Sequence, residues 1–228
     1  MKIIITAGGT SEKIDDVRSI TNTSTGSLGL AIGKHFLEAH DDIEQLYYLH
    51  GLRAKAVEGD NVTAIPIGGV RDLERELQHL LTTEKIDAVV HAMAVSDYMV
   101  KEVTTLEAIQ SGASAPLEGN KISSSIDDLT IILQRSPKVI GQIKGWSPDT
   151  VLVGFKLLSH VPHEELIEVG YNLLKKNGCS FVMANDLKDI GPGVHKGYLI
   201  HEDGSYDSMG TNEEIAEMIS KRVWEECK

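Results

Sequence analysis

Length, composition and charge limit what this chain can be. It has 228 residues, of which 41% are hydrophobic and 25% are charged, the composition of a globular protein with a full core. Its formal net charge of -12 argues against binding to nucleic acids or anionic membranes, because both need surplus Lys and Arg. The two cysteines form neither a disulfide framework nor a zinc motif. With no signal peptide and no apolar run of membrane-spanning length, we expect a cytoplasmic protein.

Strands and helices alternate along most of the sequence. A β-branched run from Lys2 to Thr6 stops at Gly8-Gly9, and apolar residues at near-helical spacing predict a helix from Leu28 to Ala39. The alternation continues with strands at 45–51, 62–69, 86–98, 150–157 and 180–187, and with helices at 70–81, 137–145, 162–176 and 211–227. This order predicts one α/β domain over residues 1–228, with a Rossmann-like, doubly wound and mostly parallel sheet.

Two regions interrupt the alternation. Residues from about 100 to 126 are polar and without clear periodicity, so we predict a flap there rather than a linker between domains. Residues from about 197 to 209 carry Asp203-Gly204 between two short strand-like runs, which predicts a β-hairpin. The last helix begins with a capping box from Thr211 to Glu214.

The residues that follow each predicted strand are the first candidates for a ligand site. Parallel strands end at one edge of the sheet, and ligands of α/β proteins bind beyond that edge. Four groups would meet there: Gly8 to Thr10, Ala92 to Tyr98, Gly154 to Lys156 and Ala184 to Asp186.

The stretch "NTSTGSLG" stands directly before the first predicted helix. Its hydroxyls and the free N–H groups of the helix start could converge on a phosphate, with Gly26 and Gly29 permitting close approach of the backbone. The alternative is a capped helix with a packing glycine, and spacing alone does not decide between them. The stretch lacks both the Lys of a Walker loop and the compact glycine motif of a nicotinamide site.

Several charged residues allow both a structural and a functional interpretation. Glu12, Asp15 and Asp16 are expected to form a solvated loop face, although a carboxylate here could bind a magnesium-phosphate through water. Lys121 is either an exposed flap lysine or one that closes over phosphates when substrate binds. Asp97 either caps a turn or accepts a hydrogen bond from a ligand.

A second constellation imitates a different enzyme class. Tyr171 and Lys175 stand at i and i+4 of a predicted helix, with Ser159 upstream, as in short-chain NAD(P)-dependent reductases. The amino-terminal glycine motif of those reductases is missing, so we expect an ordinary helix face. A non-catalytic, nucleotide-sensing module of Rossmann type is the other alternative.

The motifs "TAGGT", "NTSTGSLG", "AMAVSDY", "KI", "GFK" and "AND" occur in this order between Ile5 and Leu187. As a series they resemble phosphopantothenate-cysteine ligase of coenzyme A biosynthesis. The resemblance implies a Rossmann-like fold, a homodimer with an exchanged flap, and a Mg²⁺-dependent reaction in two steps. Phosphopantothenate is first activated by CTP or ATP as an acyl-nucleotide, and cysteine then displaces the nucleoside monophosphate. The chain looks like a free-standing ligase, so a separate decarboxylase would act next in the pathway.

The resemblance also implies roles for individual residues. Lys121 would neutralise charge on the triphosphate, and Asn22 would hydrogen-bond the acyl group and orient it for cysteine. The substrate would contact Asn22, Met93, Ala94 and Asp97. The nucleotide would contact Gly8, Gly9, Ser24, Gly26, Gly29, Asp97, Pro137, Lys138, Val139, Ile140, Phe155 and Asn185.

The sequence also departs from the common bacterial pattern. Met93 replaces an alanine, and "SPK", "GFKL" and "KISSS" look closer to the eukaryotic, ATP-using form than to the CTP-using bacterial one. The choice between CTP and ATP therefore stays open, and the sequence does not identify the magnesium ligands.

Overall fold

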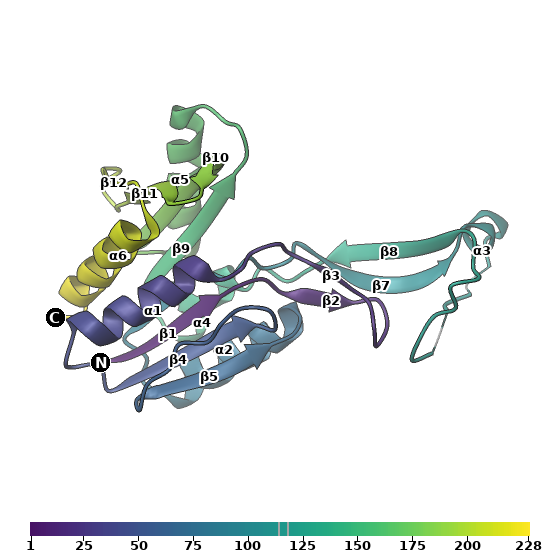
Figure 1. Ribbon diagram of the computed structural model, residues 1–228, viewed down its shortest axis with the longest axis horizontal. Coiled ribbons are helices and arrows are strands. Elements are labelled where there is room, and N and C mark those ends of the chain that lie inside the picture. The colour runs from purple at the N-terminus through teal and green to yellow at the C-terminus, as the bar shows by residue number, and fades with distance from the viewer. Residues whose placement is uncertain (114, 118) are drawn as a thin grey trace.

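The computed structural model describes residues 1–113, 115–117 and 119–228, and its centre is an eight-stranded sheet (Figure 1). The strand order is β12-β11-β10-β9-β6-β1-β4-β5. The strands are β1 (Lys2–Ala7), β4 (Gln45–Gly51), β5 (Val62–Ile67), β6 (Ala88–His91), β9 (Val151–Leu158), β10 (Phe181–Gly191), β11 (Val194–Ile200) and β12 (Tyr206–Met209). All neighbours from β10 to β5 are parallel.

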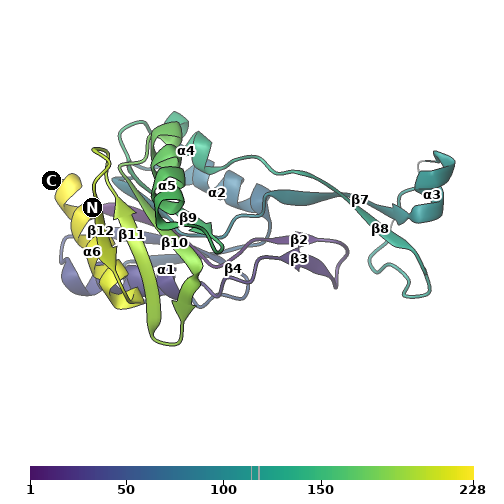
Figure 2. The ribbon, with the colours of Figure 1, turned by 90° about the horizontal axis from the view of Figure 1, so that it is seen from above.

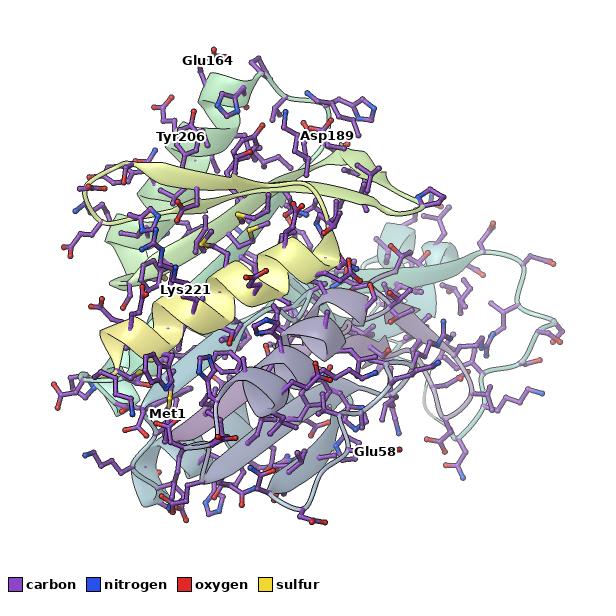
Figure 3. All side chains as sticks on the ribbon, turned by 60° about the vertical axis from the view of Figure 1, so that its left-hand side comes forward. Met1, Glu58, Glu164, Asp189, Tyr206 and Lys221 are labelled. Atoms are coloured by element: carbon purple, nitrogen blue, oxygen red, sulfur yellow. The ribbon has the colours of Figure 1, made fainter. Side chains whose placement is uncertain are left out.

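Helices cover both faces of this sheet. One face carries α1 (Ser27–Ala39) and α6 (Asn212–Glu226), which lie side by side in Figure 3. The other carries α2 (Val70–Thr83), α4 (Ile140–Trp146) and α5 (His163–Asn177). Burial on both faces explains the continuous apolar runs of β1 and β6. The predicted doubly wound, mostly parallel α/β fold is confirmed. No described helix combines the length and apolarity needed to cross a membrane.

The antiparallel end of the sheet is built from β10, β11 and β12. Strands β11 and β12 pair across a turn that contains Gly204 in the left-handed region, as the Asp203-Gly204 pair predicts. At the start of α6, the Thr211 side chain accepts a hydrogen bond from the Glu214 N–H at 3.1 Å. The Glu214 carboxylate accepts from the Gly210 N–H rather than from Thr211, so only half of the predicted capping box forms.

A long arm projects from the body of the domain (Figures 1 and 2). It consists of the antiparallel strands β7 (Tyr98–Thr105) and β8 (Leu129–Arg135), with the short helix α3 (Leu106–Ser111) near the tip. A small ribbon of β2 (Ser11–Lys13) and β3 (Ser19–Thr21) extends alongside its base. Strand β8 pairs with β7 within the arm and is not part of the central sheet. The flap predicted at about 100–126 falls in the arm, and its residues Ser114 and Glu118 lie outside the described residues.

Glycines let the start of α1 press against the end of β1. Gly26 has φ of 76°, and a Cβ added there would lie 2.9 Å from the Gly8 backbone nitrogen. A Cβ on Gly29 would lie 2.5 Å from the Ala7 Cβ. The helix therefore begins in backbone contact with the strand, which fixes the position of its first turn.

Replacing Gly29 should expose this constraint. We expect Gly29→Ala to lower the free energy of unfolding by about 1–3 kcal/mol, because the added methyl overpacks a rigid backbone contact. Gly145→Ala in α4 is the matched control, since no atom lies within 4 Å of its added Cβ. Because Gly145 is an exposed helical residue, Gly145→Ala should raise the free energy of unfolding by about 0.5–1 kcal/mol through the higher helix propensity of Ala. Urea denaturation measures both, and equal stability of the two variants would contradict the packing constraint.

Candidate active site

A cavity of about 910 Å³ opens at the carboxyl edge of the parallel sheet. It lies where β6, β9 and β10 end and where α1, α4 and α6 begin. This is the place where open α/β sheets bind ligands. A second cavity of about 180 Å³ lies on the other side of the Asn22–Thr25 segment, which lines both.

Most of the predicted site residues meet in the larger cavity. Its lining includes Asn22, Ser24, Gly26, Gly29, Met93, Ala94, Asp97, Pro137, Lys138, Val139, Ile140, Phe155 and Asn185. Three predicted residues do not line it. Gly9 lines the smaller cavity, Gly8 packs against Gly26, and Lys121 is exposed on the arm segment. The site predicted from strand ends is thus largely assembled within one chain, but its lysine is not.

The first turn of α1 leaves its amides available to a ligand. Within the described residues, no side-chain hydrogen bond caps this helix, and its first turn contains no acidic residue. The Ser27 N–H makes a long bond of 3.4 Å to the Thr25 hydroxyl. Free N–H groups and the positive end of the helix dipole favour an anion here. Gly29 packs on β1, as the structural alternative predicts, but the helix lacks the side-chain cap of that alternative. Gly29 also lines the cavity, and phosphate binding there stays a prediction.

Asn22 is held in one orientation at the cavity wall. Its Nδ2 donates to the Ala94 carbonyl oxygen at 2.7 Å. Because a carbonyl only accepts, this bond fixes which end of the amide faces Ala94. The Oδ1 atom has no partner within the described part of the chain, and one Nδ2 hydrogen is also unused. Asn22 can therefore both accept and donate a hydrogen bond to a cavity ligand.

An ion pair stands at the mouth of the cavity. The Lys138 ammonium, at the approach to α4, donates to the Asp97 carboxylate, at the start of the arm. Both side chains are largely exposed, 72% and 68% respectively. Such a pair contributes little to stability, so a ligand can displace either partner at low cost.

Two histidines that line the cavity, His195 and His91, were not predicted from the sequence. His195 of β11 sits between two amides, with 2.8 Å from its Nε2 to Asn185 Nδ2 and 2.7 Å from its Nδ1 to Asn212 Oδ1. With the amides oriented in this way, Nδ1 donates to Asn212 and Nε2 accepts from Asn185. The Asn185 side chain is thereby held at the cavity wall. His91 ends β6 and bonds Thr6 beneath the cavity. No spacing pattern marks either residue, because their partners are distant in sequence.

The acidic residues near the start of the chain correct a prediction. Asp16 is exposed, as predicted, but Glu12 and Asp15 are not part of a solvated face. Glu12 accepts from the Val70 N–H at 2.9 Å and so caps α2, and the Asp15 side chain is almost fully buried. The Arg18 guanidinium holds the pKa of Asp15 well below its usual range, although burial opposes this, and the N–H groups of Val17, Ile122 and Arg18 contribute.

Asp15 also fastens the arm segment that carries Lys121. Its carboxylate accepts from the Ile122 N–H at 3.1 Å, and Arg18 donates to the Ile122 carbonyl at 2.7 Å. The Asp16 N–H donates to the Asn120 carbonyl at 3.0 Å. The backbone is therefore tied down on both sides of Lys121.

The Tyr171–Lys175 pair does not belong to the cavity. The Tyr171 hydroxyl donates to the Glu202 carbonyl at 3.3 Å, and the Lys175 ammonium lies 3.9 Å from the Glu202 carboxylate. The Ser159 hydroxyl bonds His160 instead. None of Ser159, Tyr171 and Lys175 lines the cavity, so the reductase constellation is not assembled.

Comparison with known proteins identifies the family. The family model described as "DNA/pantothenate metabolism flavoprotein C-terminal domain" matches residues 1–226. The chain belongs to this family. The coenzyme A biosynthesis bifunctional protein CoaBC of Thermococcus kodakarensis is 30% identical over all of this chain and 51% of its own length. The protein of the same name from Methanocaldococcus jannaschii is 28% identical over 97% of this chain and 50% of its own length. The chain spans about half the length of these relatives.

Solved structures share the fold. The DNA/pantothenate metabolism flavoprotein from Streptococcus pneumoniae is 35% identical, with a TM-score of 0.88 and coverage of 99% of both chains. A Cab2 mutant in complex with phosphopantothenate-cysteine has a TM-score of 0.73 at 17% identity, covering 99% of this chain and 86% of its own. At that identity the likeness concerns the fold alone.

The buried Asp15 should make the tether depend on pH. A carboxyl group with a lowered folded pKa stabilises the native state above its unfolded pKa, here near 3.8, and this contribution is lost as pH falls. We expect Asp15→Asn to lower Tm at pH 7 and to speed hydrogen exchange around residue 122. The difference from wild type should shrink in melts taken below about pH 4.

Asp16→Asn provides the matched control for this variant, because that side chain is exposed and the residue bonds Asn120 through its backbone. Its Tm should stay close to wild type at every pH. Equal Tm values for the two variants at pH 7 would contradict the role assigned to Asp15.

Proposed function

We propose that this protein is a phosphopantothenate-cysteine ligase of coenzyme A biosynthesis. It condenses 4′-phosphopantothenate with cysteine at the expense of CTP or ATP, releasing a nucleoside monophosphate and pyrophosphate. The observation that carries this assignment is the single cavity that joins the uncapped start of α1, the fixed Asn22 amide and the strand-end residues. Membership of the family and the names of the curated relatives support it.

The first step needs two anions side by side. The carboxylate of phosphopantothenate attacks the α-phosphate, which forms the acyl-nucleotide and expels pyrophosphate. In a chain of net charge -12, the repulsion must be offset locally by donors that are already in position. The α1 amides supply such donors, and Lys138 and Lys156 line the same cavity. Lys121 would add a third cation.

The second step is an acyl transfer. The amine of cysteine attacks the activated carbonyl carbon, the amide bond forms, and the nucleoside monophosphate leaves with the electron pair of the broken C–O bond. The free Asn22 hydrogen and Oδ1 suit it to hold the acyl group for this attack.

Mg²⁺ fits the residues present as an ion carried by the nucleotide. The cavity lining offers two carboxylates, Asp97 and Glu213, and the described chain has no cluster of three or more His, Cys, Asp or Glu. Mg²⁺ is usually held by one or two carboxylates together with substrate phosphates. When bound, it would neutralise phosphate charge, and Asp97 and Glu213 are the residues that would hold it.

We propose further that the enzyme is a cytoplasmic homodimer with exchanged arms. Lys121 lines neither of the two cavities described above. The arm also exposes large apolar side chains to solvent: Tyr98, Leu106, Ile109 and Leu133. Burial against a second copy would remove this apolar surface from water and would bring Lys121 to the cavity of the partner. A separate decarboxylase would consume the product.

Product release tests the function directly. The protein is incubated with phosphopantothenate, cysteine, Mg²⁺ and either CTP or ATP, and pyrophosphate and monophosphate are measured. We expect both products, in equal amounts and only when phosphopantothenate is present. Nucleotide binding without pyrophosphate release would support a nucleotide-sensing module and refute the ligase.

Lys121 should act in the first step. We expect Lys121→Gln to slow the burst of acyl-nucleotide by about a hundredfold or more, the loss typical of one charge-stabilising donor. Lys101→Gln on the exposed face of β7 controls for general arm charge and should leave the burst unchanged. A normal burst in Lys121→Gln would contradict the assigned role.

Arm exchange predicts complementation between two inactive variants. Lys121→Gln and Asn22→Ala are co-expressed with different tags, and the heterodimer is isolated. If Lys121 serves the partner, one of the two sites is intact and activity should reach roughly half of wild type. The two variant homodimers serve as controls. An inactive heterodimer would show that arm and cavity act within one chain.

A further inference from the structure

His91 is a buried residue of the cavity that the two reaction steps leave without a task. It ends β6, is 6% exposed, and is one of the residues that line the cavity. Its Nδ1 lies 3.1 Å from the Thr6 hydroxyl, which also accepts from the Met93 N–H at 3.1 Å. The ring is therefore bonded on one side only.

These bonds favour one position for the proton of the imidazole. The Thr6 hydroxyl is fully buried, and within the described residues His91 Nδ1 is the one acceptor bonded to it. If Nδ1 donated instead, the hydroxyl hydrogen would be buried without a partner, so the arrangement favours a neutral ring that accepts at Nδ1 and carries its proton on Nε2. Burial lowers the pKa of His91 to about 4, so the ring stays neutral near pH 7.

The Nε2–H group is a donor without a protein partner. Across the described residues, no hydrogen bond to this atom occurs. It is also absent from the polar atoms that are both fully enclosed and unpaired, which are His35 Nδ1, Tyr48 Oη, Ser136 Oγ and Thr150 Oγ1. The atom therefore retains contact with open space, and the cavity is the space that His91 lines. A buried donor of this kind favours a ligand that supplies an acceptor.

The side of the sheet on which His91 lies points to one part of the ligand. Side chains alternate along a strand, so His91 shares its face with Val89, which packs in the α2, α4 and α5 layer. Buried Met93 and Val139 belong to the same layer. The start of α1, proposed to hold the triphosphate, lies on the opposite face. A nucleotide that crossed the sheet edge with its phosphates on α1 would have its base on the face where His91 lies.

Resting on the proposed function, we propose that His91 donates a hydrogen bond from Nε2 to an acceptor atom of the nucleobase and so helps to determine base specificity. The pyrimidine acceptors of CTP are O2 and N3, and the purine acceptors of ATP are N1, N3 and N7. The protonated Nε2 of His91 can donate a hydrogen bond but cannot accept one. It therefore disfavours a base that presents an N–H group at the same position. Thr6 acts as the positioning residue, because its hydroxyl fixes the tautomer.

Base analogues that lack one acceptor test this on the wild-type protein. Binding is measured by calorimetry for the parent nucleotide and for its deaza series, 3-deaza-CTP or 1-, 3- and 7-deaza-ATP. We expect one deaza position, or O2 replacement in the pyrimidine, to weaken binding about tenfold, as for one lost hydrogen bond. If no acceptor replacement changes the affinity beyond twofold, the assignment to the base is wrong.

Variants of His91 then link the effect to this residue. His91→Leu should weaken binding of the parent nucleotide about tenfold and leave binding of phosphopantothenate unchanged. The base analogue that binds the wild-type protein more weakly should bind His91→Leu with the same affinity as it binds the wild type. His91→Gln can place an amide N–H near the position of Nε2, and we expect partial rescue. If His91→Leu weakened only the binding of phosphopantothenate, or weakened the binding of nucleotide and phosphopantothenate equally, the proposal would be overturned.

Two readouts keep the test independent of folding and of the ligase assignment. Nitrogen NMR of wild-type His91 should show the neutral tautomer protonated at Nε2, and protonation at Nδ1 would refute the geometry. The analogue series measures binding in wild-type protein, whereas pyrophosphate release measures the ligase reaction. If the protein distinguishes nucleotides by their base acceptor atoms but releases no pyrophosphate, the proposed ligase function is refuted and the proposed role of His91 is supported.

Discussion

The backbone contact between the start of α1 and the end of β1 is the constraint on which the site depends. A helix can offer its first amides to an anion only if no side chain blocks or caps them. At Gly26 and Gly29 the absence of a Cβ brings the helix within contact of Gly8 and Ala7. That contact holds the uncapped turn at the same sheet edge as Asn22 and the residues after β6. Bulkier residues would separate the helix from the strand and move the amides.

Electrostatics explains how this acidic chain could hold the anionic substrates proposed for it. The charges that line the cavity are balanced, with Lys138 and Lys156 against Asp97 and Glu213. Two acidic side chains near the start of the chain have structural partners, Glu12 at the start of α2 and Asp15 beside Arg18. Donors fixed in advance stabilise developing charge without rearrangement. The proposed contribution of Lys121 from a second protomer would add one more cation to this site.

The sequence predicted the parts that local periodicity determines. Leu73, Leu77, Leu80 and Leu81 mark the buried face of α2, and the structure buries all four. The strand-end groups could be predicted to meet because parallel strands share one ligand-binding edge. The glycine stretch could be placed at a helix start, but its two interpretations could not be separated, since the position of Ala7 against Gly29 is a tertiary fact.

The features that sequence reasoning missed depend on partners distant in the chain. Asp15 looked solvated because its partner Ile122 is 107 residues away, and the tautomer of His91 depends on Thr6, 85 residues away. Strands β7 and β8 pair mainly with each other outside the central sheet. A two-stranded ribbon that does not cover the central core needs no alternation of apolar and polar residues, so the sequence shows no strand periodicity there.

The position of the triphosphate can be determined in a crystal structure of the protein with phosphopantothenate and a non-hydrolysable nucleoside triphosphate. We expect phosphate oxygens within hydrogen-bonding distance of the α1 amides after Gly26, and the Lys121 ammonium of a second protomer beside them. A triphosphate bound away from that helix start, with Lys121 directed to solvent in every protomer, would contradict this expectation.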